Sequence, residues 1–495
     1  MELDPVSCHR ILQARDARYD GRFFTCVKTT GIYCRPVCPA RPPKLQNCLF
    51  VPTAAAAQEA GFRPCLRCRP ECSPELHAWR GSSATVTRAL SLIERGALDE
   101  GDVEALGARL GVGARQLRRL FRKHLGAAPI TVAQTRRVLL AKQLLHESDL
   151  SMTSVAMASG FSSLRRFNEV FQHLYGRPPS ALRRPTGRVP PGSSIELFLP
   201  YRTPYDFAAL LGFLGARAIP GVEVVEAGRY RRVIDAGGAL GVLEVEDCSE
   251  RSALRVNVRL DRLEALPGVI ARVRHAFDLG ADPQIVATQL GSDPVLSPLV
   301  AARPGLRVPG AWDGFETAVR AVLGQQISVR AATRLAGKLV TLLGEPLERD
   351  LREPGLTHAF PRATRFVPEK LSALGMPRAR IAALATLAAG YVADPQLFDA
   401  GRDLDEAVAR LRALPGIGEW TAQYIALRAL RESDAFPAGD VALQRVLAER
   451  GVRPSERAVL ARAEAWRPWR AYAVLHLWTA DAAPEGKERL DALAS

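Results

Sequence analysis

No stretch of this 495-residue sequence approaches the ~18 consecutive apolar residues that a membrane-spanning helix needs, so we expect no membrane segment. The first residues, Met-Glu-Leu-Asp-Pro, lack the basic and then apolar pattern of a signal peptide, which predicts a cytoplasmic protein. Aromatic residues are few, at 6%, but 47% hydrophobic and 24% charged residues exclude a disordered or collagen-like chain. The length predicts about three domains of roughly 150 residues each.

Cysteine is nearly absent beyond the first 72 residues. Eight of the nine cysteines lie between positions 8 and 72, and only Cys248 lies beyond them. Because cytosolic proteins rarely use disulfides, a dense patch of this kind indicates a metal site or a catalytic site.

Acidic residues are scarce in the first part of the chain. Residues 1–192 hold 29 Lys and Arg against 15 Asp and Glu, a net charge of +14, whereas the remaining residues hold 38 and 37, a net charge of +1. A basic part joined to a neutral part indicates that the first part binds a polyanion, most simply nucleic acid. A solvated basic surface without such a partner is the alternative.

The residue pattern divides the chain into modules. A cysteine-rich module (1–78) precedes a module (84–184) in which Leu, Ala and Val recur at helical spacing between arginines. Residues 185–193 contain three prolines and two glycines, which predicts a linker. A small α+β module (194–282) and a larger helical module (283–495) follow. We therefore expect a multidomain, mainly helical α+β protein.

Five strands and two helices are predicted in the small α+β module. The helices lie near 205–215 and 267–279, and Ala236-Gly237-Gly238 predicts a hairpin turn. Alternating or clustered β-branched residues predict strands at 195–199, 222–226, 231–235, 241–246 and 254–259.

Four cysteines form two close pairs, Cys34 with Cys38 and Cys65 with Cys68, in the spacing C-x3-C, 26 residues, C-x2-C. Each pair can span one edge of a tetrahedron, and the loop between the pairs brings them together, which predicts a Zn(Cys)4 site. Four free core cysteines are the alternative.

The remaining cysteines are given no place in this site. Cys26 is predicted in a buried strand and Cys248 in an acidic loop, while Cys48 and Cys72 have no assigned role. Ser7-Cys8-His9-Arg10-Ile11 is similar to the Pro-Cys-His-Arg-Val active site of O6-alkylguanine methyltransferases. That motif needs a folded domain around it, and only six residues precede Ser7, so we do not assign Cys8 this chemistry.

Further matches surround the cysteine pairs, at Asp20-Gly21, Thr29-Thr30-Gly31-Ile32-Tyr33-Cys34-Arg35-Pro36, Ala40-Arg41, Asn47 and Ala60-Gly61-Phe62-Arg63-Pro64-Cys65. With them, residues 10–72 resemble the N-terminal domain of the Ada family of methyl-phosphotriester-sensing DNA repair regulators. The resemblance implies that Cys34 is both a zinc ligand and the acceptor of a methyl group from a backbone phosphotriester. It also implies contacts to DNA phosphates from Thr30, Arg41 and Arg63. Zinc keeps a thiol as its nucleophilic thiolate at neutral pH.

Two helix–turn–helix patterns follow. The first joins Val103–Val112 to Ala114–Lys123. The second joins Met152–Met157 through Gly160-Phe161-Ser162-Ser163 to Leu164–Tyr175, followed by Gly176-Arg177-Pro178-Pro179. In tandem they resemble the double helix–turn–helix domain of AraC-type transcription factors.

In the first unit, one helix face carries the apolar residues Leu117, Leu120 and Phe121. Arg115 and Gln116 then lie on other faces, where such side chains can read base edges in a major groove. A helical bundle with a solvated arginine face is the alternative.

The segment Leu414-Pro415-Gly416-Ile417-Gly418-Glu419-Trp420-Thr421-Ala422 predicts a helix-hairpin-helix turn. Gly416 and Gly418 let the backbone approach a DNA phosphate, toward which the amides of the second helix point. Asp440 follows 22 residues after Gly418, in a loop rich in Gly and Pro. This combination is the signature of the superfamily of base-excision DNA glycosylases. A chance tight turn and a helix N-cap are the alternative interpretations of the hairpin and of Asp440.

From about Glu196 to the C-terminus the chain resembles 3-methyladenine DNA glycosylase II of the AlkA type. The resemblance implies that the small α+β module is the N-terminal domain of that family. The matching segments are Pro204-Tyr205-Asp206, Leu211–Ala218, Asp282–Val286, Arg303–Gly310, Val322–Ser328 and Trp466–Tyr472.

A base pocket lined by Phe213, Trp420, Tyr424 and Trp478 is implied by the same resemblance. Aromatic faces suit a flipped, cationic alkylated base, and the carboxylate of Asp440 can stabilise the positive charge that builds on the sugar and orient water. Tryptophans that only fill the core are the alternative.

Two absences and one departure refine this prediction. Bifunctional relatives carry a lysine two residues after the last hairpin glycine, where this chain has Trp420, so we expect no strand cleavage. No cysteine follows Cys248, so we expect no iron–sulfur cluster. Gln326 stands where relatives insert a leucine into the DNA stack, and a glutamine there can fill the gap and hydrogen-bond the orphan base.

The sequence thus predicts a fused alkylation-response protein with one zinc ion. Its expected partner is double-stranded DNA carrying alkylated bases, methyl phosphotriesters or an operator, with RNA polymerase as a second candidate, and its expected place is the nucleoid. Two other hypotheses stay open. One is a transcription regulator with a catalytically inactive glycosylase-like clamp, and the other is a repair enzyme whose N-terminal part only tethers it to DNA.

Overall fold

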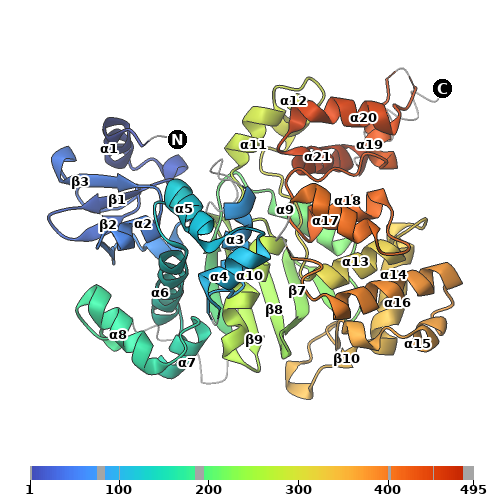
Figure 1. Cartoon of the computed structure of the whole chain (residues 1–495), viewed down its shortest axis with the longest axis horizontal. Helices are drawn as coiled ribbons and strands as arrows, with labels where there is room; N and C mark the ends of the chain where they lie inside the picture. The colour runs from blue at the N-terminus through green and yellow to red at the C-terminus, as the bar shows by residue number, and fades with distance from the viewer. Residues whose placement is uncertain are drawn as a thin grey trace. The chain divides into compact units, whose positions relative to one another are not determined.

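The computed structural model describes residues 3–74, 84–99, 101–183, 194–399, 403–449 and 451–482. The linker expected at 185–193 lies outside them. The chain divides into two compact units (Figure 1): unit 1 comprises Met1–Arg202 and Ala236–Ala271, and unit 2 comprises Thr203–Asp235 and Arg272–Ser495. Among the described residues, no helix is long and apolar enough to cross a membrane.

Unit 1 begins with a small four-stranded sheet in the order β3-β1-β2-β4. The central strand β1 runs antiparallel to β2 and β3, whereas β4 runs parallel to β2. Cys26 is fully buried in β1, as predicted. The elements of this zinc module are α1 (Pro5–Ala14), β1 (Phe24–Val27), β2 (Ile32–Cys34), β3 (Cys48–Val51), α2 (Ala54–Glu59), β4 (Arg63–Pro64) and the 3-10 turn η3 (Pro70–Cys72).

Both predicted helix–turn–helix pairs are present in unit 1, and a long helix, α6, connects them. Leu117 and Phe121 are fully buried and Leu120 partly buried, because their i, i+3, i+4 spacing places them on one helix face. The elements of this reader module are α3 (Ala84–Glu94), α4 (Val103–Arg109), α5 (Ala114–Leu125), α6 (Pro129–Glu147), α7 (Met152–Ala158), α8 (Leu164–Tyr175) and η4 (Pro179–Leu182).

All the strands and helices predicted between residues 195 and 282 are found. In unit 1, β9 pairs antiparallel with β5 and with β8. In unit 2, β6 pairs antiparallel with β7. Gly237 and Gly238, with φ of +67° and +83°, form the turn between β7 and β8. The elements are β5 (Ile195–Pro200), α9 (Phe207–Gly215), β6 (Glu223–Glu226), β7 (Arg229–Ala236), β8 (Ala239–Cys248), β9 (Ala253–Leu260) and α10 (Leu266–Ala276).

One prediction in this stretch is wrong. Cys248 is not in a loop but is the last residue of β8, paired with Ala253 of β9. The acidic residues before it suit a strand because each has a partner: Glu246 forms an ion pair with Arg255 on β9, and Asp247 accepts a hydrogen bond from the Tyr201 hydroxyl at 2.6 Å.

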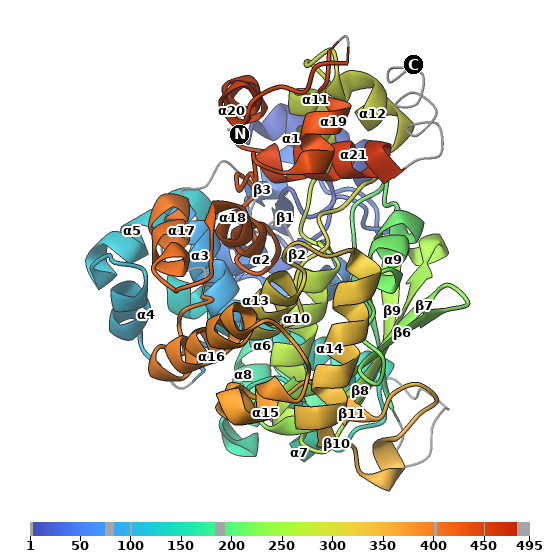
Figure 2. The same ribbon diagram turned by 90° about the vertical axis from the view of Figure 1, so that its right-hand side faces the viewer.

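The rest of unit 2 is a helical domain in which α13 packs against α14, α16 and α18, and α17 packs against α18 (Figure 2). A two-stranded antiparallel sheet, β10 (Glu345–Pro346) with β11 (His358–Ala359), interrupts the helices. The helices are α11 (Pro283–Leu290), α12 (Leu296–Ala302), α13 (Gly314–Leu323), α14 (Val329–Leu343), α15 (Pro368–Ser372), α16 (Arg378–Ala393), α17 (Leu404–Arg412), α18 (Glu419–Arg428), α19 (Val441–Val446), α20 (Glu456–Ala463) and α21 (Arg470–Ala482).

Candidate metal centre and candidate base pocket

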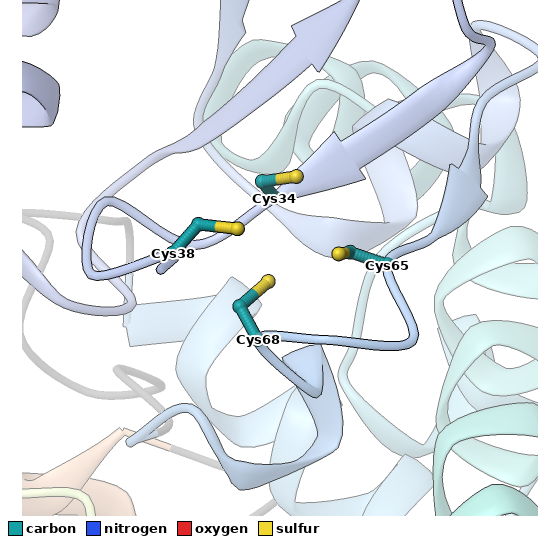
Figure 3. A group of neighbouring side chains, drawn as sticks. All are labelled: Cys34, Cys38, Cys65 and Cys68. Atoms are coloured by element: carbon teal, nitrogen blue, oxygen red, sulfur yellow. The ribbon is translucent and has the colours of Figure 1, made fainter. Parts of the chain in front are cut away.

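Four cysteine sulfurs meet beside the small sheet of unit 1 (Figure 3). The parallel pairing of β2 with β4 brings Cys34, the last residue of β2, close to Cys65, which directly follows β4. Cys38 and Cys68 come from the loops that follow. All four Sγ atoms lie within 4.8 Å of one another. The structure therefore brings together the four residues whose spacing predicted a metal site.

This cluster fits a tetrahedral zinc ion. A Zn–S distance of ~2.3 Å places four thiolate sulfurs ~3.8 Å apart, within the span of the cluster. Two backbone N–H groups donate to its sulfurs at 3.3 Å, Arg35 to Cys68 and Arg67 to Cys65. Hydrogen bonding with the neighbouring thiols raises the pKa of Cys34, because sulfurs this close resist ionising together. A divalent cation favours the thiolate form of each, so the donor set suits zinc.

Four other cysteines of the zinc module, Cys8, Cys26, Cys48 and Cys72, lie outside the cluster, and burial raises the pKa of each thiol. Burial raises the pKa of Cys26 to about 12. Burial also raises the pKa of Cys8 and of Cys72 to about 11 each. These groups carry too little thiolate at neutral pH to compete as nucleophiles.

A cavity of about 360 Å³ opens beside Cys34. Cys34 is half-buried, whereas the other three cysteines of the cluster are buried, so its sulfur is the one best placed for a reaction with an outside molecule. Thr30, Arg41 and Arg63, the three predicted phosphate contacts, all line this cavity. The sequence analysis missed Arg67 and Arg177, which line it too.

On the reader module, α5 presents the predicted base-reading residues outward. Arg115 and Gln116 are exposed on α5, while the opposite face of the helix is buried. Gln116 accepts a hydrogen bond from Arg119 at 2.8 Å, and Arg118 pairs with Glu104 at 2.8 Å. The contacts that these side chains make with bases stay a prediction.

In unit 2 the hairpin between α17 and α18 is built as its glycines predicted. Gly416 has φ +89°, and a Cβ on it would lie 2.5 Å from the Ala383 side chain on α16. Gly418 caps α18 with no side-chain hydrogen bond, so the first backbone N–H groups of that helix stay available to an anion. Both glycines are exposed.

Asp440 is both a helix cap and a part of the cavity wall. Its Oδ1 accepts the backbone N–H groups of Ala442 and Leu443 at the start of α19, at 2.9 and 3.3 Å. Its Oδ2 accepts the indole N–H of Trp420, on α18, at 2.9 Å. The N-cap interpretation of Asp440 is therefore correct, and the same residue also lines a cavity of about 500 Å³.

Three of the four predicted pocket aromatics line this cavity: Trp420, Tyr424 and Trp478. The rings of Trp420 and Tyr424 stack at 5.2 Å and 11°, as their i, i+4 spacing on α18 allows. The ring of Trp478, on α21, lies 6.2 Å from Tyr424. Phe213, on α9, stacks on Trp478 at 6.5 Å and 17° but does not itself line the cavity.

Two arginines that the sequence analysis did not single out hold the aromatic wall. Arg428 donates to the Tyr424 hydroxyl at 2.7 Å and to the carbonyl of Gly310 at 3.1 Å. The Arg217 guanidinium lies 3.8 Å from the centroid of the Phe213 ring. Burial alone would raise the pKa of the Tyr424 phenol, but Arg428 and Arg217 together lower it.

Gln326 lies in the connection between α13 and α14, is exposed and has φ +59°. Its neighbour Gln325 is tied to the hairpin, because the Gln325 amide donates to the carbonyl of Gly416 at 2.9 Å and to the Thr421 hydroxyl at 3.3 Å. Arg380 donates to the Gln325 carbonyl at 2.6 Å. These contacts fix Gln326 relative to the hairpin glycines.

Comparison with known proteins agrees with this division of the chain. Three family models match: the metal binding domain of Ada at residues 7–71, a helix-turn-helix domain at 106–185 and the AlkA N-terminal domain at 196–313. Together with the two folded units, these matches confirm the predicted fold class.

Two curated relatives and one solved structure are similar to the chain. A probable bifunctional transcriptional activator/DNA repair enzyme AlkA of Mycobacterium tuberculosis is 41% identical over 484 residues, which cover 97% of each chain. The DNA-3-methyladenine glycosylase 2 of Escherichia coli is 38% identical over 283 residues, 57% of this chain and 95% of the relative. The 3-methyladenine DNA glycosylase of Archaeoglobus fulgidus shares the fold with a TM-score of 0.51 and 24% identity, over 58% of this chain and 97% of that one.

Proposed function

Because this chain belongs to the family of bifunctional transcriptional activator/DNA repair enzymes of the AlkA type, we propose that it repairs alkylated DNA in two ways. Unit 2 excises alkylated bases such as 3-methyladenine by hydrolysing the N-glycosidic bond. The zinc module takes a methyl group from a DNA methyl phosphotriester onto Cys34. The reader module then binds an operator and activates transcription.

The position of Asp440 is the observation that supports the proposed glycosylase activity most strongly. Three N–H donors, from Trp420, Ala442 and Leu443, hold its carboxylate in one orientation at the edge of the aromatic cavity. When the bond between sugar and base breaks, the sugar becomes cationic, and a fixed carboxylate stabilises that charge without reorganising. Asp440 also accepts a proton from the water that attacks the sugar. The leaving base departs with the electron pair of the bond.

The aromatic wall selects the base. A base flipped out of the duplex is stabilised when it stacks against Trp420, Tyr424 or Trp478, and an alkylated purine gains further because its positive charge faces a ring. Since Trp420 occupies the position of the lyase lysine, the enzyme is monofunctional and leaves an abasic site. Gly416 and Gly418 bind a phosphate of the same strand, and Gln326 fills the gap in the stack.

At the metal centre, Cys34, Cys38, Cys65 and Cys68 would hold one zinc ion, which when bound would keep the Cys34 sulfur as a thiolate. The Cys34 sulfur attacks the methyl carbon, so an S–C bond forms and the C–O bond breaks. The phosphate keeps the electron pair and becomes an ordinary anionic diester. Thr30, Arg41 and Arg63 orient the DNA backbone at the cavity. No iron–sulfur cluster is part of the proposal, because no cysteine follows Cys248.

The partner of both activities is double-stranded DNA, bound as damaged substrate and, through α5 and α8, as operator. RNA polymerase is the further partner that activation requires. We place the protein in the cytoplasm on the nucleoid. The test of the pair of activities is release of 3-methyladenine and loss of methyl phosphotriesters from the same methylated DNA, with the methyl label recovered on Cys34. Base release without methyl transfer would mean that the protein is only a glycosylase. Methyl transfer without base release would mean that it is a regulator with a catalytically inactive glycosylase-like clamp.

A further inference from the structure

The cavity beside Cys34 has walls from two modules of unit 1. Most of its lining belongs to the zinc module, but one residue, Arg177, comes from the segment that follows α8 in the reader module. Nothing in the proposed methyl transfer has so far used this residue. Its place in the cavity makes the reader module a part of the methyl-acceptor site.

The backbone around Arg177 is tightly constrained. Gly176 ends α8 in the left-handed conformation, with φ +68° and its N–H bonded to the carbonyl of Gln172 at 2.9 Å. Pro178 follows Arg177 and restricts it to extended backbone. Tyr175 before this turn and Pro179 after it are both buried. The guanidinium therefore projects from a fixed point, although Arg177 itself is exposed.

The reader module that carries Arg177 is locked to the zinc module through α6. Lys142 of α6 is fully buried and donates to the carbonyl of the metal ligand Cys65 at 3.0 Å and to the Glu71 carboxylate at 2.8 Å. Thr135, also on α6, donates to Gln58 of α2 at 3.0 Å. The 3-10 turn η4, which begins two residues after Arg177, packs against α6 in turn. The position of Arg177 at the cavity thus follows from buried contacts.

The cavity is strongly cationic. Four arginines line it, and no acidic residue does; they are Arg41, Arg63, Arg67 and Arg177. In the part of the chain that the structure describes, none of the four guanidinium groups forms an ion pair with a carboxylate. The zinc-loaded cysteine cluster brings a formal charge of −2 to this cavity against four arginines, so a net positive charge remains. Arginines gathered in this way are typical of sites that bind phosphates.

We propose that Arg177 binds a DNA phosphate next to the methylated one while Cys34 takes the methyl group, so that the reader module supplies part of the sensor's DNA-binding surface. This inference rests on the proposed methyl transfer to Cys34. A methyl phosphotriester is itself neutral, so the cationic cavity must hold the DNA through the neighbouring diesters. Because Arg177 lies two residues after the last residue of α8, DNA bound at Cys34 is also held at one end of a reading helix.

The experiment uses the full-length zinc-loaded protein and a duplex with one labelled methyl phosphotriester. The initial rate of label transfer is measured against DNA concentration at several salt concentrations for the wild type, Arg177→Ala and Arg177→Lys. The matched control is Arg18→Ala, which removes an exposed arginine of the zinc module that pairs with Asp16 at 2.7 Å and does not line the cavity. Zinc content is measured for each variant.

Arg177→Ala should raise the half-saturating DNA concentration about 5- to 10-fold and reduce the slope of log affinity against log salt by about 0.9, the value for one lost phosphate contact. Its rate at saturating DNA and its zinc content should match the wild type. Arg177→Lys should restore most of the affinity, and Arg18→Ala should behave as the wild type. Unchanged affinity and salt slope in Arg177→Ala would overturn the inference while leaving methyl transfer intact. No transfer by the wild type would instead overturn the proposed function, and the inference with it.

Discussion

The indole N–H of Trp420 lies 2.9 Å from Oδ2 of Asp440 and donates a hydrogen bond to it. This bond joins α18, the second helix of the hairpin, to the loop that carries the carboxylate. Trp420 thus has two parts in the site, since its ring lines the cavity and its nitrogen orients the carboxylate that we propose stabilises the sugar cation.

Removing only this donor should slow base release. We expect Trp420→Phe to retain DNA binding, because an aromatic ring remains, and to lose about 10- to 100-fold in single-turnover release of 3-methyladenine. One hydrogen bond to a charged group is worth roughly 1.5–3 kcal/mol, which corresponds to this range. The matched control is Trp466→Phe, which removes an indole N–H bonded to Asp293 at 2.8 Å in the same unit. Equal release by the two variants would mean that the bond to Asp440 has no role in the reaction.

Abasic sites made by the enzyme should stay uncut. A lyase needs an amine at the sugar, and Trp420 occupies the position where bifunctional relatives carry a lysine. Incubation with damaged DNA and borohydride should therefore trap no covalent enzyme–DNA adduct, whereas alkali added afterwards should cleave the product strand. A trapped adduct would contradict the monofunctional mechanism.

Buried charges at the cavity of unit 2 should make this unit sensitive to acid. Burial alone would raise the pKa of Glu223, but Arg320 and Arg232 lower it to about 2 from 4.5. A carboxyl group with a lowered pKa contributes stability that is complete above pH 4.5 and is lost as the pH falls toward 2. The shift corresponds to about 3 kcal/mol.

Glu223→Gln should therefore lower the free energy of unfolding by about 3 kcal/mol at pH 7 and by much less near pH 3. Urea unfolding, followed by tryptophan fluorescence, measures the free energy of unfolding of unit 2. Five of the six tryptophans lie in this unit, at positions 312, 420, 466, 469 and 478. A difference between variant and wild type that does not shrink at low pH would show that Glu223 acts through packing rather than charge.

Methylation of Cys34 should tighten DNA binding. Zinc with four thiolates carries a formal charge of −2, and with one thioether it carries −1, so the site repels phosphates less. The interaction energy of two unit charges ~4 Å apart is about 1 kcal/mol in bulk water and about 4 kcal/mol near a protein surface, where the effective dielectric constant is lower. We expect the methylated protein to bind operator DNA roughly 10- to 1,000-fold more tightly at low salt, with a gain that shrinks as salt rises.

A titration of methylated and unmethylated protein at two salt concentrations measures this gain. Cys34→Ser should bind zinc more weakly and accept no methyl group. Equal affinities of the two forms at low salt would mean that the metal centre repairs phosphotriesters without signalling.

Local sequence patterns predicted the elements and much of the sites. The strands between 195 and 260 follow from β-branched alternation, and the cluster of four cysteines follows from the spacing of its pairs. Asp440 followed from its distance to the hairpin, although only the structure shows that Trp420 holds it.

These local patterns could not predict contacts between residues that lie far apart in the sequence. Lys142 and Glu223 have charged side chains that sequence reasoning assigns to a solvated face, but partners far along the chain allow both to be buried. Arg177 likewise shows no local signal for the cavity beside Cys34, because only the fold of unit 1 brings it there. Cys248 was misplaced since the ion pair of Glu246 with Arg255 depends on strand register.

The central claim, that Asp440 stabilises the sugar cation during base release, is tested most directly by single-turnover release of 3-methyladenine by Asp440→Asn. Asparagine keeps the N-cap of α19, so the fold and DNA binding should stay close to wild type. The control, Asp481→Asn, changes a carboxylate that lines the same cavity but pairs with Arg445 at 2.8 Å. We predict that Asp440→Asn loses at least about 100-fold in release, in line with several kcal/mol of charge stabilisation, while Asp481→Asn stays within about 3-fold. Release by Asp440→Asn at near the wild-type rate would contradict the account.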